Sequence, residues 1–338
     1  MNLTDAKYTQ FGLVRDMLAT ADVVANFSAD QAKETGRAIA QVGRLLLTGE
    51  GSSRIFPAKN AIANARRLNW PITLHTEAGR QAQEYDLANW AVFAASNSGK
   101  TSEVIKLFND LRGKGHEHLY GLTASENSKL GELSEKCYVL KCGPEGAVAA
   151  TKSVIEQALF YQAMLEHACG IPLLGRRCRL LSEQIATALT TPIDPKITDK
   201  IAAAGSIYFA GRNDGVAEEL TLKTNEITRK KSDFLEGTYA VHGIEEVMNK
   251  DDVVVLIDPY EDALGKFNDV LVKGVGLTVI TIATKPTSFP SIVVPECDLQ
   301  PYVMMAAGWN VLVEVGVKLG INLDKPVRAR KVGNEFVG

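Results

Sequence analysis

Short apolar runs alternate with longer segments in which apolar residues recur at helical spacing, and this alternation extends over most of the chain. In the first half, helices are expected at residues 54–68 and 103–111. The apolar runs around them lie at residues 44–49, 91–95, 118–123 and 137–140. Continuous apolar strands separated by helices are typical of a parallel sheet covered by helices on both faces. The pattern therefore predicts an α/β fold.

The second half of the chain repeats the order of the first. Residues 206–211 align with residues 44–49, and residues 253–258 align with residues 91–96, each 162 positions later. A repeat of this length indicates a duplicated domain, because solenoid units are much shorter. We expect two tandem three-layer αβα units with parallel sheets, of a flavodoxin-like or Rossmann-like type.

The same pattern predicts where the domains begin and end. The opening residues have helical spacing, and several prolines surround a helical stretch between the two repeats, which we interpret as a connector. The expected segments are an N-terminal helical segment at 1–34, a first domain that binds phosphate at 35–170, a connector at 171–200, a second domain at 201–323 and a C-terminal tail at 324–338.

Composition excludes several classes of protein. The 46% of hydrophobic residues and 23% of charged residues are ordinary values for a globular protein, which excludes a disordered chain. A net charge of −3 disfavours a general nucleic-acid binder. No signal-peptide pattern and no apolar run long enough for a membrane span is present. The five cysteines lack close pairing motifs, so we expect reduced thiols and a cytoplasmic location.

A loop rich in hydroxyl groups follows the second apolar run. Residues 96–101 contain two serines, a threonine, an asparagine and a glycine, and a helix is expected directly after them. Ligands of open α/β sheets bind at the carboxyl ends of strands, and a helix N-terminus favours an anion. Residues 51–53 add two serines after the preceding run. These loops predict a phosphate site, and the alternative is that the serines only cap two helices.

Two better-known phosphate motifs do not fit. A Walker A loop ending at Lys100 would need a glycine at the position of Ala94. A dinucleotide fingerprint beginning at Gly49 would need a third glycine where Arg54 stands. In the second repeat, the residues equivalent to the serine loop are 258–261, whose two carboxylates would repel a phosphate. The anion site is therefore expected in the first repeat alone.

Together these residues resemble the sugar isomerase (SIS) family, and in particular the isomerase portion of glutamine–fructose-6-phosphate aminotransferase and single-chain isomerase-deaminases of fructosamine or aminosugar phosphates. The resemblance covers residues from about 35 to about 335. The motifs that carry it share their order and spacing with the family and lie at residues 51–53, 96–101, 145–152, 223–226 and 242–243.

The resemblance implies a role for each matching residue. The residues implied in substrate binding are Ser52, Ser53, Ser96, Asn97, Ser98 and Thr101, with the backbone of Val148, Ala149 and Ala150. Glu226 holds the position of the base that moves a proton between C1 and C2. Lys223 lies on the same helical face. His242, 16 residues after Glu226, would assist ring opening from a neighbouring subunit, and Lys331 in the tail would reach the substrate carbonyl.

These roles make chemical sense, and less specific interpretations stay open. A carboxylate can remove a proton at one carbon and deliver it at the next. A neighbouring lysine can stabilise the oxyanion, and a tail lysine can form a Schiff base. Alternatively, Glu226 is a solvated surface charge, His242 is structural and Lys331 belongs to a solvated basic tail.

The sequence therefore predicts a phosphosugar isomerase or deaminase that acts on an amino- or amine-substituted hexose 6-phosphate. We expect no metal, no organic cofactor, no glutaminase activity, no nucleic-acid or membrane partner, and a cytoplasmic homodimer with a shared active site. A plain aldose–ketose isomerase and a non-catalytic sugar-phosphate-binding regulator are the alternatives. Lys100 departs from the acidic residue of the family, as do residues 243–246 from its usual Gly-Pro, and both departures bear on the identity of the sugar.

Overall fold

The chain folds into two compact units, each built from several stretches of sequence. The computed structural model describes residues 1–328 and 335–336. The serine-loop unit comprises Asp22–Pro144, Lys152–Arg179 and Arg330–Gly338. The lysine unit comprises Met1–Ala21, Glu145–Thr151 and Leu180–Ala329. Each unit is described separately below.

A five-stranded parallel sheet forms the centre of the serine-loop unit. Its strands are β1 (Arg44–Thr48), β2 (Thr73–Glu77), β3 (Ala91–Ala95), β4 (Leu119–Thr123) and β5 (Lys136–Val139), in the spatial order β2-β1-β3-β4-β5. Strands β1, β3 and β4 are almost wholly buried because they lie inside the sheet and carry apolar residues in continuous runs. The chain reverses its direction of travel across the sheet between β1 and β3, which makes that position the topological switch point.

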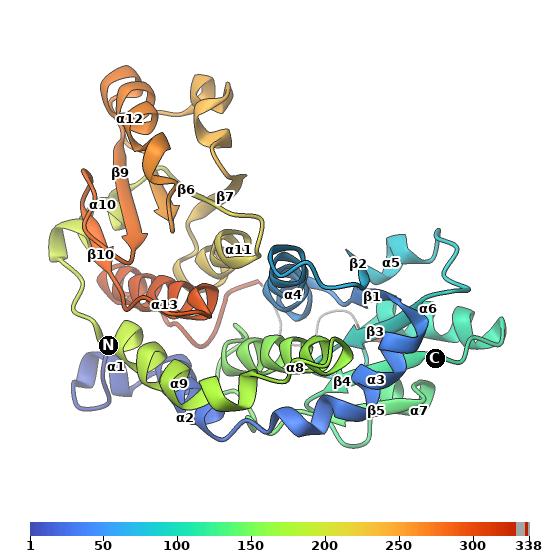
Figure 1. Cartoon of the computed structure of the whole chain (residues 1–338). Coiled ribbons are helices and arrows are strands. Elements are labelled where there is room, and N and C mark those ends of the chain that lie inside the picture. Colours follow the sequence, from blue (N-terminus) through green and yellow to red (C-terminus); the bar gives the residue numbers. More distant parts are fainter. Residues whose placement is uncertain (329–334, 337–338) are drawn as a thin grey trace. The chain divides into compact units, whose positions relative to one another are not determined.

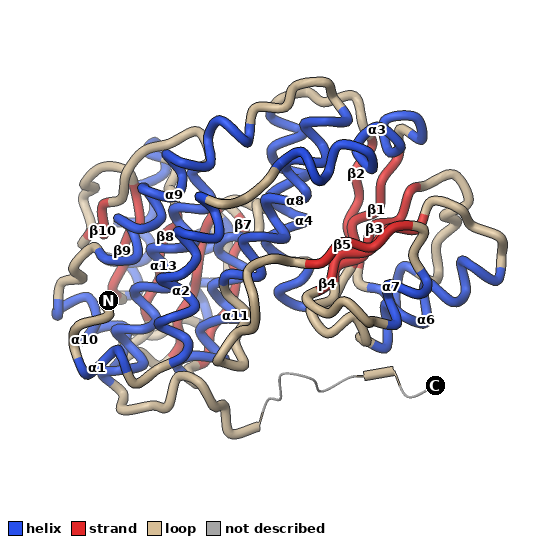
Figure 2. Tube along the Cα trace, turned by 90° about the horizontal axis from the view of Figure 1, so that it is seen from below, coloured by secondary structure: helices blue, strands red, loops and turns tan. Residues whose placement is uncertain are grey.

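Helices cover both faces of this sheet (Figure 2). On one face lie α3 (Lys33–Val42), α4 (Ile55–Arg67) and α8 (Lys152–Ala168), and on the other lie α5 (Gly79–Ala82), α6 (Ser102–Gly113) and α7 (Lys129–Leu133). Helix α8 is buried along nearly its whole length. An apolar cluster under α6 joins Val92 and Ala94 of β3 to Ile105 and Phe108.

The lysine unit contains a second parallel sheet of five strands. Its strands are β6 (Ser206–Gly211), β7 (Lys231–Glu236), β8 (Val253–Ile257), β9 (Thr278–Ala283) and β10 (Ser291–Val293), in the order β10-β9-β8-β6-β7. Read from β7, this is the same order as in the first sheet, with the switch point between β6 and β8. The prediction of two αβα units with parallel sheets is confirmed.

The helices of the lysine unit come from distant parts of the chain (Figure 1). Apart from short 3₁₀ turns, those described wholly within it are α1 (Ala6–Thr9), α10 (Pro195–Ala203), α11 (Val216–Thr228), α12 (Leu264–Phe267), a π-helix at Asn268–Val275 and α13 (Gln300–Lys318). Helix α13 packs against α10 and α11. Helices α2 (Gly12–Ala25) and α9 (Leu174–Thr190) each contain a boundary between the units. Among the described residues, no helix has both the length and the apolar character that a membrane crossing requires.

The strands that the sequence did not predict lie at or near the sheet edges. Strand β2 is only half-buried, and β7 alternates exposed and buried positions. Strand β10 has three residues. These strands lack a continuous apolar run because one side or one face of each meets solvent, so the pattern that revealed the central strands is absent from them.

Candidate functional site

Two loops meet at the switch point of the first sheet. The serine loop (residues 96–101) follows β3, and the glycine–serine loop (residues 49–54) follows β1, which pairs with β3. A Cβ atom placed on Gly49 would lie 2.8 Å from the carbonyl oxygen of Ala95, so the ends of the two strands are in close contact. The structure therefore brings the two predicted hydroxyl-rich loops together at the switch point of the sheet.

The serine loop is a tight turn held by its own polar groups. The Ser96 side chain is buried, and its Oγ lies 2.7 Å from Oγ1 of Thr101. The Gly99 N–H donates to both the carbonyl oxygen and Oγ of Ser96, at 2.9 and 3.1 Å. Gly99 has a φ of +63°, and a Cβ there would lie 2.3 Å from Cβ of Ser128. Only glycine fits this position without displacing its neighbours.

The helix behind the loop leaves its first N–H groups without a side-chain cap. Thr101 is the N-cap residue of α6 and makes no side-chain hydrogen bond to the helix. The first N–H groups of a helix have no partner within it and attract anions. On the other side of Thr101, residues of the C-terminal tail pair with the loop: Glu335 forms an antiparallel bridge with Thr101, and the Phe336 N–H donates to the Lys100 carbonyl at 2.8 Å.

Asn97 and Ser98 differ in where their side chains are held. The Asn97 amide donates to Oγ of Ser153 at 2.9 Å and accepts from Gln157 at 3.0 Å, so it is held by α8. Ser98 is half-buried, and its Oγ accepts the Lys100 N–H at 3.2 Å. Ser98 is therefore more exposed than Ser96.

The glycine–serine loop forms a short 3₁₀ turn at Gly51–Ser53. Gly51 has a φ of +53°, and Ser52 and Ser53 are half-buried. Within this loop, Oε1 of Glu50 accepts the Gly79 N–H at 2.9 Å. Burial raises the pKa of the Glu50 carboxyl, and the nearby carboxylates of Glu103 and Glu77 act in the same direction, while the Gly79 bond and Arg54 oppose it. Sequence reasoning missed Glu50 and Arg54 as candidate site residues, although both lie within the loop that it examined.

In the lysine unit, α11 places Lys223 among carboxylates. The Lys223 side chain is fully buried, and its Nζ lies 2.6 Å from Oε2 of Glu226 and 3.4 Å from Oε1 of Glu219. Burial opposes the charged form of the lysine, but Glu226, Glu219 and Glu145 outweigh that effect, so the pKa of Lys223 is raised. Glu219, one helical turn before Lys223, was missed by sequence reasoning, although its spacing of four residues from the lysine was a usable signal.

Glu226 lies at the solvent-facing end of this cluster. Its side chain is 23% exposed, whereas those of Lys223 and Glu219 are inaccessible. Arg229 ends α11 with a φ of +58°, and its guanidinium donates to the backbone carbonyls of Glu226 and Ile227. The same guanidinium donates to the carbonyl of Lys325 at 3.0 Å. The carboxylate is thus oriented by a buried lysine on a helix whose end is tied to the start of the tail.

The backbone stretch expected to line the sugar also belongs to the lysine unit. Ala149 is buried, while Val148 and Ala150 are half-buried. The Val148 N–H donates to the Asp324 carbonyl at 3.2 Å. The Asp324 carboxylate accepts the N–H groups of Gly12 and the next residue, both at 2.8 Å, at the start of α2. This stretch is therefore bonded to Asp324, near the last residues of the lysine unit, and Asp324 is bonded in turn to the start of α2, near its first residues.

His242 and Lys331 are less well defined. His242 is exposed, with Nε2 3.4 Å from Nζ of Lys266. Within the described residues, no hydrogen bond or ion pair joins His242 to Glu226. Lys331 lies outside the described residues.

The switch point of the second sheet has a different chemistry. Asp258, directly after β8, has a φ of +45° and accepts from Arg212 at 2.5 Å. The Arg212 guanidinium also lies 4.5 Å from the centre of the Tyr260 ring. An ion pair and a cation–π contact thus occupy the position that hydroxyls occupy in the first sheet.

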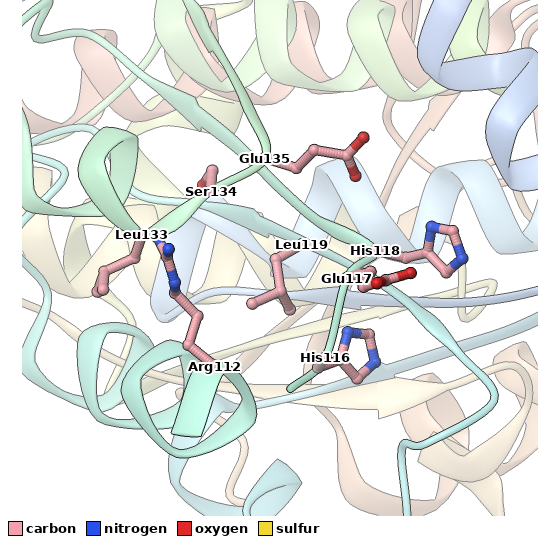
Figure 3. A pocket seen from close by; sticks show the side chains of 8 residues that line it. All are labelled: Arg112, His116, Glu117, His118, Leu119, Leu133, Ser134 and Glu135. Carbon is pink, nitrogen blue, oxygen red and sulfur yellow. The ribbon is translucent and has the colours of Figure 1, made fainter. Parts of the chain in front are cut away.

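A pocket of about 410 Å³ lies elsewhere in the serine-loop unit (Figure 3). Arg112, His116 and His118 line it, next to Leu119 at the amino end of β4. Arg112 is engaged there with the Glu132 carbonyl, at 2.8 Å. Because open α/β sheets bind ligands at the carboxyl ends of their strands, this pocket is not the candidate active site. The described residues also contain no group of three histidine, cysteine or acidic side chains placed to hold a metal ion.

Comparisons with known proteins agree with this architecture. No protein-family model matches the chain. Glutamine–fructose-6-phosphate aminotransferase from Aeropyrum pernix is 26% identical over 267 residues, which cover 70% of this chain and 42% of that protein. The chain thus spans less than half the length of this curated relative.

Solved structures show the same fold over nearly the whole chain. The C-terminal domain of glucosamine-fructose-6-phosphate aminotransferase from Francisella tularensis has a TM-score of 0.78 and 15% identity, and the match covers 96% of this chain and 100% of that one. Glucosamine-6-phosphate deaminase from Thermotoga maritima has a TM-score of 0.73 and 19% identity, covering 96% and 99%. Tagatose-6-phosphate ketose/aldose isomerase from Escherichia coli has a TM-score of 0.76 and 17% identity, covering 96% and 98%.

Fold and sequence therefore define a structural class of two tandem αβα units with parallel sheets, and the chain resembles the sugar isomerase (SIS) family. Within this class, the chain resembles the isomerase portion of glutamine–fructose-6-phosphate aminotransferase, as its motifs predicted.

Proposed function

We propose that the protein is a phosphosugar isomerase or deaminase that transfers a proton between C1 and C2 of an amino- or amine-substituted hexose 6-phosphate. The observation that carries the proposal is the serine loop, which lies at the switch point of a parallel sheet and precedes a helix whose N-cap residue makes no side-chain cap. Such a position favours a phosphate. The SIS resemblance supports the same class of substrate.

Phosphate binding is assigned to the serine-loop unit. Ser98, Ser52 and Ser53 are half-buried and able to donate hydroxyl hydrogen bonds to phosphate oxygens. The first N–H groups of α6 add donors with the favourable end of the helix dipole. Ser96 and Thr101 hold the turn in shape through their mutual contact. The loop is thus largely formed before the ligand arrives, which lowers the entropic cost of binding.

Proton transfer is assigned to Glu226. Its carboxylate removes a proton from one of the two carbons, which leaves an enediol or, when the substrate carries an amine, an enolamine. The same carboxyl group then delivers that proton to the other carbon, while a second proton passes from the oxygen or nitrogen on one carbon to the oxygen on the other, so the atoms balance without a further reactant. Lys223 holds Glu226 at 2.6 Å and fixes its orientation. In a deaminase, water would then hydrolyse the resulting imine and release ammonia.

The remaining assignments come from the resemblance. His242 would move a proton to or from the ring oxygen from a neighbouring subunit, and Lys331 would reach the carbonyl. The backbone of residues 148–150 would contact the sugar. A homodimer in the cytoplasm that needs no metal or organic cofactor completes the proposal.

Exchange of carbon-bound hydrogen with solvent tests the proposed reaction. We expect the protein to incorporate deuterium from D₂O at C1 or C2 of a hexose or aminohexose 6-phosphate, measured by NMR, and to leave the unphosphorylated sugars unchanged. Release of ammonia would identify a deaminase, while exchange without ammonia would identify the plain aldose–ketose isomerase that the Escherichia coli neighbour favours. Binding of these phosphates without any exchange would contradict an enzyme and indicate a regulator.

A further inference from the structure

A buried glutamine on α8 contacts the serine loop from behind. Gln157 is fully buried, and its Nε2 donates to Oδ1 of Asn97 at 3.0 Å. One turn later on the same helix, the Tyr161 ring packs edge-on against Phe93 of β3, with ring centres 5.3 Å apart. This face of α8 therefore packs on the strand that ends in the serine loop.

The contact with Gln157 fixes the orientation of the Asn97 amide. Because Nε2 of Gln157 can only donate, Oδ1 of Asn97 must face it, and Nδ2 of Asn97 donates to Oγ of Ser153 at 2.9 Å. The backbone of Asn97 is held as well, since its carbonyl accepts from Oγ1 of Thr123 at 3.1 Å and from the Ala124 N–H at 3.0 Å. Asn97 is thus attached to α8 by its side chain and to β4 by its main chain.

The other end of the glutamine amide is costly to bury. Within the described residues, Oε1 of Gln157 is inaccessible to solvent and accepts no hydrogen bond. A buried acceptor without a partner is unfavourable, and an apolar side chain of similar volume would avoid this cost. What the amide provides, and an apolar residue could not, is the hydrogen bond to Asn97.

We propose that Gln157 is a positioning residue for phosphate binding. By holding Asn97, it keeps the serine loop in the conformation in which Ser98 and the N–H groups of α6 face the phosphate. The inference rests on the proposed function for the identity of the ligand, while the ordering of the loop is independent of it. Gln157 itself contacts no substrate in this scheme.

The same helix offers a matched control. Gln162 is equally buried, and its amide also bonds to other side chains: it accepts from Asn64 at 3.0 Å and donates to Glu166 at 2.8 Å. None of these bonds reaches the serine loop. Replacing either glutamine with methionine removes a buried amide of similar volume, so both variants report the cost to folding, but only Gln157→Met disturbs Asn97.

Steady-state kinetics and hydrogen exchange separate the two variants. The substrate is the hexose 6-phosphate that shows solvent exchange. We expect Gln157→Met to raise KM about tenfold, because one hydrogen bond that orders a binding loop is lost. The value of kcat should stay within about twofold of the wild type. In the protein without ligand, amide exchange at residues 96–101 should speed up by a similar factor. Gln162→Met should leave both quantities within about twofold of the wild type.

Each outcome decides the inference. Equal changes in the two variants would reduce Gln157 to a structural residue, and unchanged KM and loop exchange in Gln157→Met would overturn the proposal outright. A wild-type protein that neither binds nor turns over any sugar phosphate would refute the proposed function. In that case, faster exchange of the loop in Gln157→Met alone would still support the ordering of the loop by Gln157.

Discussion

The two sheets share one strand order but differ at their switch points. At the first, hydroxyl groups and a helix without a side-chain cap surround the loop that follows the third strand. At the second, Asp258 and Arg212 form an ion pair in the equivalent place. Helix α11, which follows the first strand of the second sheet, instead carries Lys223 and Glu226.

This difference shows how one topology can support two kinds of chemistry. The fold determines that loops and helix N-termini gather at the carboxyl edge of each sheet. The side chains placed there determine whether that edge attracts an anion, as at the first sheet, or holds an ion pair, as at the second, while Lys223 and Glu226 lie toward the C-terminal end of α11. The proposed division of roles, with phosphate binding in one unit and proton transfer in the other, follows from the side chains and not from the fold.

Removing the proposed base should have the largest effect. We predict that Glu226→Gln lowers kcat by about 10²–10⁴-fold, because the amide cannot accept a proton, while sugar-phosphate binding persists. Solvent exchange at C1 and C2, followed by NMR, measures it. The matched variant Glu218→Gln, in the first turn of α11, should stay close to wild type. A fully active Glu226→Gln would show that the lysine unit does not supply the base.

Distorting the serine loop should be next in size. Gly99→Ala must place a Cβ at a positive φ and 2.3 Å from Ser128, so we expect sugar-phosphate affinity to fall about 100-fold and the free energy of unfolding by about 1–3 kcal/mol. Calorimetric titration and urea unfolding measure these. The control Gly113→Ala, in α6 with no heavy atom near its Cβ position, should bind normally. Unchanged binding by Gly99→Ala would remove the loop from the site.

A smaller effect is expected from Glu50, which lies beside the serines. Burial and neighbouring carboxylates raise the pKa of the Glu50 carboxyl in the folded protein. Above the ordinary value of about 4.3, this carboxyl ionises more readily in the unfolded chain. The free energy of unfolding therefore falls as the pH rises through the pKa of the folded state. We predict that Glu50→Gln removes this part of the fall. Urea unfolding at several pH values between about 4 and 7 tests it. Glu84→Gln, at an exposed position, should leave the fall in place; a fall that persists in Glu50→Gln would be contrary to our account.

The smallest effect is expected at the second switch point. Asp258→Gly relieves a positive φ and loses an ion pair whose side chains are 33% and 41% exposed, so the two effects nearly cancel and stability should change by less than about 1 kcal/mol. Sugar-phosphate affinity should be unchanged, as measured by the same titration. A loss of affinity would mean that the second switch point also takes part in binding.

The sequence revealed the central strands and the serine loop because both leave local signals. Strands such as β3 and β8 are continuous apolar runs, and the loop carries its hydroxyls within six residues. The half-exposed β2 and β7 gave no such pattern. The order of the strands in each sheet could not be predicted from the sequence, since register and neighbouring strands are properties of the folded chain.

The chemistry of the site was only partly visible in the sequence. The spacing of Lys223 and Glu226 predicted their contact, which the structure has at 2.6 Å. The contact between Asn97 and Gln157 could not be predicted from the sequence, because residues 60 positions apart meet only through tertiary packing. The part of Arg229 in tying α11 to the start of the tail leaves no local signal in the sequence.

The most direct test is the affinity of the wild-type protein for an aminohexose 6-phosphate compared with the same sugar without phosphate, measured by calorimetric titration. If the serine loop binds the ester, the phosphorylated sugar should bind at least about 100-fold more tightly, because its charged oxygens gain hydrogen bonds that the hydroxyl cannot make. Equal affinity for the two sugars would contradict the account.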